Sequence, residues 1–334
     1  SSTWTPATRS TANVGTPQGT VTALQGGSTP LYLHTLYTDS IASPSSDVCP
    51  DTAVLTRATP VKDDNMYGSF GVSAYSYTGS WSESRTPDYF YNATASKSGS
   101  GDYALASTYY WPGASYKMKF FAYAPKDNGQ YVLSGSTHPG SPTIGVTIPS
   151  DVNDQEDLLV AQTAELAGNT NTAVALTFNH ALTAVRFVCG NDMQDGTVKS
   201  VSLKNVYSKG TYNMGTQTWS DVDTPADFSQ TLDKSTTGTP NEALTTDAQT
   251  FMMIPQTLPD GAQIEVVFTD YAGTDHTLTA DIKGTEWPIG KTVTYKISSS
   301  SINWKYTIKI NMPNEFTYTG GTLQYSVVLY KENG

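Results

Sequence analysis

Hydrophobic and polar residues alternate with a period of two along most of the chain, and each alternating run ends at Gly, Pro, Asn or Asp. The runs span residues 67–77, 116–125, 143–149, 173–178, 182–188, 199–206, 249–255, 262–270, 276–283 and 291–297. This period is typical of half-buried β-strands, and the closing residues favour turns. Many short strands separated by turns predict an all-β sandwich architecture.

Helical periodicity is nearly absent from the sequence. The best helix candidate, DVNDQEDLLVAQTAELAG (151–168), gathers its apolar residues at Leu158, Leu159 and Val160, which fits a short strand with a turn equally well. In YKMKFFAYAP (116–125) both alternating faces are apolar. We therefore expect this strand to be covered on both sides, which makes its rings core residues.

The polar stretch LAGNTNTA (166–173) suggests a domain boundary. The expected division is an extended leader over 1–29, an N-terminal β-sandwich over 30–168, a C-terminal β-sandwich over 169–300 and a segment over 301–334. That last segment holds two strand-like runs, INWKYTIKINM and GTLQYSVVLYKE. Two strands do not make a stable domain alone, so it is either a β appendage or the start of a third domain.

The charge and the apolar content of the sequence exclude some classes of function. Of the 334 residues 15% are charged and the net charge is −11, so the chain has no electrostatic footprint for nucleic acid or an anionic membrane surface. No stretch approaches the roughly 20 apolar residues of a membrane span. No signal peptide is visible, and we expect the sequence to be a trimmed or mature form.

The stretch GTEWPIGKTVTYKI (284–297) contains Gly-Lys-Thr without the earlier glycine of a phosphate-binding loop, and it continues as an alternating strand. We expect a turn into a strand. Cys49 lies in a loop sequence, whereas Cys189 shares its strand face with Val185 and Phe187. This favours two separate thiols, with Cys189 a small core residue; a disulfide is the alternative.

Catalytic and metal-binding patterns are missing from the sequence. The four histidines are His34, His138, His180 and His276. They form no metal-binding pair, and no Gly-x-Ser-x-Gly elbow occurs. The acidic cluster at 151–157 favours a solvated turn over a calcium loop, because it lacks the loop glycine. We expect no catalytic site, no cofactor and no metal.

Aromatic residues are dense between Tyr67 and Tyr123. Within this region DYFYN (88–92) sits among turn formers, so Tyr89 and Tyr91 are candidates for stacking on a glycan. Packing in the core is the alternative for both rings.

Three stretches carry a family resemblance. They are STYYWPGASYKMKFFAYAP (107–125), EDLLVAQT with VALTFNHALTAVRF (156–187), and VSLKNVYSKGTYNMGTQTWS (201–220) with EWPIGKTVTYKI. Together, over about residues 55–300, the sequence resembles the fimbrillin family of Bacteroidales bacteria, the type V pilins and their relatives. The resemblance implies two transthyretin-like β-sandwich domains with a C-terminal β extension. It also implies a precursor exported as a lipoprotein and displayed on the cell surface at the outer membrane, in a fimbria.

In that family a protease removes an N-terminal strand and a strand of the next subunit fills the groove, so the implied partners are other fimbrial subunits. The cut commonly follows an arginine, and the candidates here are Arg57 and Arg9; a solvated surface role is the alternative for both. We favour Arg57, because PLYLHTLY (30–37) precedes it and would be the removable strand. The two faces of this strand would be Leu31, Leu33 and Thr35 against Tyr32, His34 and Leu36.

Two departures from the family pattern matter. The lipidated N-terminal cysteine is missing, so contact with a membrane would be through a lipid anchor absent from this chain. The C-terminal segment looks unlike a finished donor, which predicts a tip or accessory pilin rather than a stalk pilin. The alternative is a monomeric module that binds a host glycan or protein.

Two tripeptides, DSI (39–41) and DTA (51–53), resemble sites that Bacteroidales glycosylate on exported proteins. They predict O-linked sugars on Ser40 and Thr52.

Overall fold

The computed structural model describes residues 17, 19–41, 60–61, 66–98, 102–190, 192–237, 242–301, 305–310 and 327–332. Within these residues the regular structure is β-strand apart from two 3-10 turns, η1 (Val152–Asp154) and η2 (Asp247–Gln249). The prediction of an all-β fold is confirmed. In the described part of the chain, no helix has the length and apolar character needed to cross a membrane.

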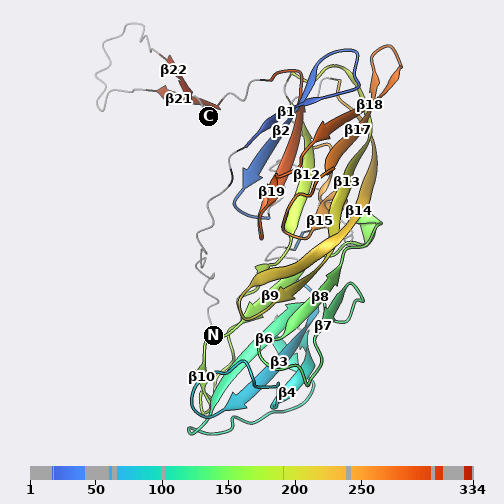
Figure 1. Cartoon of the computed structure of the whole chain (residues 1–334). Coiled ribbons are helices and arrows are strands. Elements are labelled where there is room, and N and C mark those ends of the chain that lie inside the picture. The colour runs from blue at the N-terminus through green and yellow to red at the C-terminus, as the bar shows by residue number, and fades with distance from the viewer. Residues whose placement is uncertain are drawn as a thin grey trace, which may run out of the picture.

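A seven-stranded sheet forms the lower end of the elongated molecule in Figure 1. Its strands, in order, are β11 (Asn179–His180), β9 (Leu159–Gln162), β6 (Lys117–Ala124), β3 (Ser69–Tyr77), β4 (Phe90–Lys97) and β5 (Tyr103–Leu105), with β10 (Leu166–Ala167) beside β6. On β6, Met118 and Phe120 are buried on one face and Phe121 and Tyr123 on the other. The prediction that this strand is covered on both sides is confirmed.

A six-stranded sheet joins the two ends of the molecule. Its strands, in order, are β18 (Asp275–Asp281), β17 (Gln263–Asp270), β13 (Gly196–Asn213), β8 (Thr143–Thr147) and β7 (Tyr131–Leu133), with β14 (Thr218–Ser235) along β13. The first half of β13 pairs with β17 and the second half with β8. A strand from the predicted C-terminal domain thus pairs with one from the predicted N-terminal domain, and the division at residues 168 and 169 stays a prediction.

A five-stranded sheet lies at the upper end of Figure 1. Its strands, in order, are β1 (Val21–Leu24), β2 (Leu31–Thr38), β20 (Thr292–Ser298), β12 (Thr183–Cys189) and β15 (Phe251–Met253). β2 is antiparallel to β20, and β20 is parallel to β12. This differs from the expectation that residues 30–168 form one sandwich, because the start of the chain pairs with a strand more than 250 positions later.

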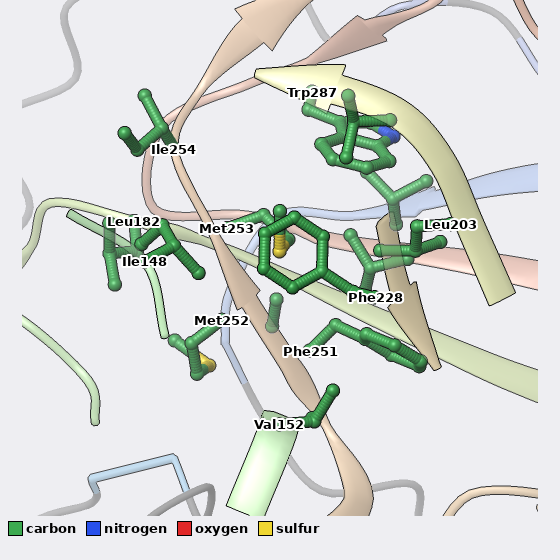
Figure 2. Packing of buried hydrophobic residues seen from close by; sticks show 14 of the residues in the cluster. Ile148, Val152, Leu182, Leu203, Phe228, Phe251, Met252, Met253, Ile254 and Trp287 are labelled. Carbon is green, nitrogen blue, oxygen red and sulfur yellow. The ribbon is translucent and has the colours of Figure 1, made fainter. Parts of the chain in front are cut away.

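One buried hydrophobic cluster contains residues of all three sheets. Figure 2 shows its centre, where Phe228 of β14 and Phe251 of β15 lie close to Leu203 of β13. Val152 of η1 lies beside the same group, so the core continues from one end of the molecule to the other. The indole of Trp287, 1% exposed, donates a hydrogen bond to the Tyr295 hydroxyl at 3.0 Å.

Several finer expectations were tested by the strand bounds. The stretch 151–168 forms η1, β9 and β10, a short strand with turns rather than an α-helix. The run at 173–178 is wrong as a strand, because its apolar residues pack on the outer face of the seven-stranded sheet without pairing to a neighbouring strand. The stretch 284–297 forms β19 (Glu286–Trp287), which pairs with β16 (Gln256–Thr257), then a turn and β20.

The C-terminal segment contains β21 (Lys305–Ile310) and β22 (Val327–Glu332), which form a two-stranded antiparallel sheet. Each strand has six residues. The expectation of a β extension after residue 300 is thus confirmed, while its role as an appendage or as part of a further domain stays open.

Candidate functional site

The N-terminal hairpin, defined here as β1 and β2, is built into the five-stranded sheet. β2 has hydrogen-bonded neighbours on both sides, β1 over four register pairs and β20 over seven. In Figure 1 the hairpin is the blue pair of strands at the upper end, far along the molecule from the seven-stranded sheet. The chain's first described strands therefore complete a sheet whose other strands come from its second half.

Both faces of β2 are covered. Leu31 and Leu33 are each 1% exposed and belong to the main core, where Leu33 lies opposite Ile297 of β20. On the outward face His34 is 0% exposed, and Tyr32 is half-buried. Fully burying a leucine side chain contributes about 2 kcal/mol, so the leucines fix this strand firmly.

The hairpin also reaches the six-stranded sheet. Gln25, directly after β1, exchanges two backbone hydrogen bonds with Thr279 of β18, with N–O distances of 2.8 and 2.9 Å. Gly26 has φ +99°, and a Cβ there would lie 2.3 Å from the carbonyl oxygen of Thr277. Glycine is needed at this contact. The hairpin thus fills the space between β20 on one side and β18 on the other.

The chain leaves β2 at a fixed point. The Thr292 hydroxyl donates to the Ser40 carbonyl at 2.8 Å, and the Lys291 ammonium lies 3.2 Å from the Asp39 carboxylate. Ile41 is buried at 5% exposure, and Ser40 itself is exposed. Whether Ser40 is glycosylated stays a prediction, and Thr52 lies outside the described residues.

The chain is next described at Pro60 and Val61, on the seven-stranded sheet. The Val61 amide donates to Oδ2 of Asp157 at 3.0 Å, and Nδ1 of His180 lies 2.7 Å from the same oxygen. Residues 42–59, which include Arg57, therefore connect the N-terminal hairpin to the strands that follow it in the sequence. Arg57 and Arg9 both lie outside the described residues.

Asp157 departs from the expectation of a solvated acidic turn, because its side chain is 0% exposed. Burial lowers the pKa of His180, but the Asp157 carboxylate and its hydrogen bond outweigh this, so the pKa of His180 is raised. Sequence reasoning placed His180 at a strand end, which is confirmed, and missed its ion pair. No group of three His, Cys, Asp or Glu among the described residues is close enough to hold a metal ion.

Cys189 is free and buried at 1% exposure, as the strand parity predicts. Burial raises the pKa of its thiol to about 11, and the carboxylates of Glu242 and Asp192 add to this. Cys49 lies outside the described residues.

The candidate glycan-stacking residues are half-buried. Tyr91 donates its hydroxyl to the carbonyl of Ser134 at 2.7 Å, and Tyr89 donates to the carbonyl of Tyr110. The Tyr110 ring is 81% exposed, so its face is open to solvent while its backbone is held by Tyr89. No sequence signal singled out Tyr110, because exposure depends on how the loop folds.

Fold and site together define a class: an all-β protein in which an N-terminal hairpin completes a sheet made by distant parts of the chain. Residues 56–313 match the family described as Fimbrillin-like, and this range covers more than half of the chain. The protein belongs to the fimbrillin-like family. The matched range begins after the N-terminal hairpin.

A fimbrium subunit and a solved fimbrial structure are among the proteins that this chain is similar to. Fimbrium subunit Fim1C of Phocaeicola vulgatus is 26% identical over 222 residues, which span 56% of this chain and 58% of that protein's own length. The crystal structure of a fimbrial protein from Bacteroides vulgatus superposes with a TM-score of 0.52 at 20% identity. The superposition covers 79% of this chain and 92% of the other, and at this identity it shows a shared fold.

Proposed function

We propose that this protein is a structural and adhesive subunit of a cell-surface fimbria, assembled by strand donation after the N-terminal hairpin is removed. One observation carries the proposal: β2 is an interior strand with both faces covered, and residues 42–59, which include Arg57, connect it to the strands that follow. Kinship with a fimbrium subunit supports the same role.

Loss of the hairpin would leave unpaired backbone groups on β20 and an apolar floor formed by residues such as Val293, Tyr295 and Ile297. An open sheet edge of this kind pairs readily with a strand from another chain. The space that β1 and β2 would leave is called the seat here. It extends from β20 to β18 and is two strands wide. The two-stranded extension β21–β22 of a second copy matches that width and is our candidate donor.

Location and role in the fimbria are part of the same proposal. Cell-surface display at the outer membrane, with export as a lipoprotein precursor, follows from the family resemblance. The C-terminal sequence, which looks unlike a finished donor, favours a tip or accessory position, whereas donation of β21–β22 from copy to copy would give a stalk position; the ladders tested below distinguish the two. O-glycosylation on Ser40 fits its exposure, and mass spectrometry of native protein tests it: a hexose on Ser40 is expected, and its absence contradicts this part.

Cleavage with an Arg-specific protease tests the function. Wild-type protein, Arg57→Lys and the control Arg9→Lys are digested, and the products are examined on unboiled SDS gels and by electron microscopy. We expect ladders from wild type and Arg9→Lys but not from Arg57→Lys, and fewer or none without residues 302–334. A chain that is cut after Arg57, loses the hairpin and never associates with fimbrial subunits contradicts the proposal.

A second candidate function is a monomeric module that binds a host glycan or protein through tyrosine rings, and the exposed Tyr110 ring favours it. Glycan-array binding tests it. Tyr110→Ala should abolish binding, Tyr89→Ala should weaken it by freeing the Tyr110 backbone, and Tyr91→Ala should have the smallest effect. The matched control is Tyr271→Ala, since Tyr271 is 89% exposed on the turn between β17 and β18.

A further inference from the structure

His34 occupies an unusual place in the N-terminal hairpin. It lies on the outward face of β2, yet its side chain is 0% exposed. Its Nε2 lies 2.7 Å from the carbonyl oxygen of Ser300, two residues beyond the end of β20. The segment that leads toward the C-terminal extension therefore folds back over the strand that the proposed function removes.

The segment around Ser300 is held in place by further hydrogen bonds. The Ser300 amide donates to the Ser298 hydroxyl at 3.1 Å, and that hydroxyl donates to the Asp192 carboxylate at 2.6 Å. The Gly190 amide donates to the Ile297 carbonyl at 2.7 Å. The Ser300 carbonyl is thus presented to His34 by an ordered turn.

The hydrogen bond fixes the tautomer of the neutral His34 ring. A carbonyl oxygen accepts only, so Nε2 carries the proton and donates it, which leaves Nδ1 as the bare nitrogen of a neutral ring. Nδ1 is buried and has no hydrogen-bond partner among the described residues. A second proton would therefore place a buried positive charge on a nitrogen without an acceptor.

We propose that His34 is a pH-sensitive latch that ties the N-terminal hairpin to the base of the C-terminal extension. At neutral pH the uncharged ring holds β2 and the Ser300 turn together. Acid protonates the ring, and the charged form favours the state in which β2 has left its seat and His34 is in water.

The charges around His34 agree with this direction. Burial is the largest effect and lowers the pKa of His34, and the Lys296 ammonium on β20 lowers it further. The Ser300 hydrogen bond and the Asp192 carboxylate raise the pKa. The pKa of His34 is lowered on balance. The neighbour on β1 is Val21, which does not titrate. Because the pKa is lower in the seated strand, the latch is complete above the ordinary histidine pKa of about 6.5 and weakens as pH falls below it.

The biological meaning of the latch rests on the proposed function, since it would keep the removable strand and the candidate donor together until the hairpin leaves. The latch itself is a property of the intact chain. It is therefore tested without cleavage or assembly, so its failure and the failure of strand donation are separate results.

Hydrogen exchange measured on the intact chain tests the latch. Peptides covering 31–38 and 292–301 are followed from about pH 7.5 to about pH 5.5, with rates corrected for the intrinsic effect of pH. Wild type should lose about fivefold protection in both peptides at the lower pH. His34→Phe should show weak protection of 292–301 that no longer depends on pH, whereas the control His138→Phe, in the loop between β7 and β8, should behave as wild type.

Two charge variants that leave His34 in place carry the test if His34→Phe does not fold. Asp192→Asn removes a group that raises the pKa of His34, so the midpoint of the protection change should move to lower pH. Lys296→Gln removes a group that lowers it, so the midpoint should move to higher pH. Protection that is independent of pH in wild type, or midpoints that do not move in opposite directions, would overturn the latch.

Discussion

At the scale of single residues, the most consequential buried polar groups lie where the chain changes direction between sheets. Asp157 holds the Val61 amide and His180 with one carboxylate oxygen, so it fixes the chain just after the link at 42–59. On the other side of that link, in β2, His34 donates a hydrogen bond to the Ser300 carbonyl and so holds β2 to the segment after β20. Both groups are buried, so the loss of a partner has a large cost.

We predict that His180→Leu destabilises the protein by about 2 kcal/mol near pH 6, because the buried Asp157 carboxylate loses its charged partner. The pKa of His180 is raised in the fold, so its stabilisation is complete below about pH 6.5 and fades as pH rises through the raised pKa. Urea unfolding followed at about pH 6 and about pH 9 should show a larger effect at the lower pH. An effect of equal size at both values would contradict the ion pair.

Cys189 gives a second prediction at this scale. Burial and neighbouring carboxylates raise the pKa of its thiol to about 11, so it is both shielded and protonated near pH 8. In a Cys49→Ser background, a thiol reagent such as DTNB should label Cys189 only in urea. Rapid labelling of the folded protein would show that β12 is open beside β20.

At the scale of elements, the strands that a local pattern can define were predicted, and those that depend on distant partners were not. β3, β6, β12, β17 and β20 coincide with alternating runs. β14 was missed because its sequence is mostly polar, and it is a strand because it pairs with β13 from Thr197 opposite Ser235 to Asn213 opposite Thr218. The run at 173–178 alternates but packs without a strand partner.

The candidate site shows the same limit. The alternation in 30–37 predicted a strand with Leu31 and Leu33 on one face, but no local pattern could show that this face enters the core or assign β20 as the neighbour. The contact between His34 and Ser300 joins residues 266 positions apart, so it was likewise beyond sequence reasoning.

The burial of Leu33 gives a prediction about how tightly β2 is held in its sheet. Leu33→Ala leaves a cavity in the core that costs about 3 kcal/mol, so a severed hairpin should leave roughly a hundredfold faster than in wild type. The control is Leu36→Ala, at a half-buried position on the outward face. A protease site inserted within 42–59 cuts the chain independently of Arg57, and size exclusion with mass spectrometry measures how long the peptide is retained. Equal retention in both variants would contradict the account.

At the scale of the whole molecule, the protein is elongated, and the N-terminal hairpin lies in the same sheet as β20, the strand that precedes the C-terminal segment. The N-terminal hairpin fills a seat between β20 and β18, and the C-terminal extension begins directly after β20. Under the proposed function, removal of the hairpin and use of the extension as a donor would be connected through β20.

The central claim is that this seat accepts strands from another chain, and hydrogen exchange of β18 and β20 tests it most directly. The chain is cut at an inserted site within 42–59, the hairpin is removed, and a peptide of residues 302–334 is added. The account predicts that the amides of 275–281 and 292–298 lose protection when the hairpin leaves and regain it with the peptide. If protection is unchanged by loss of the hairpin, or is never restored by the peptide, then the seat is not the strand-accepting groove proposed here.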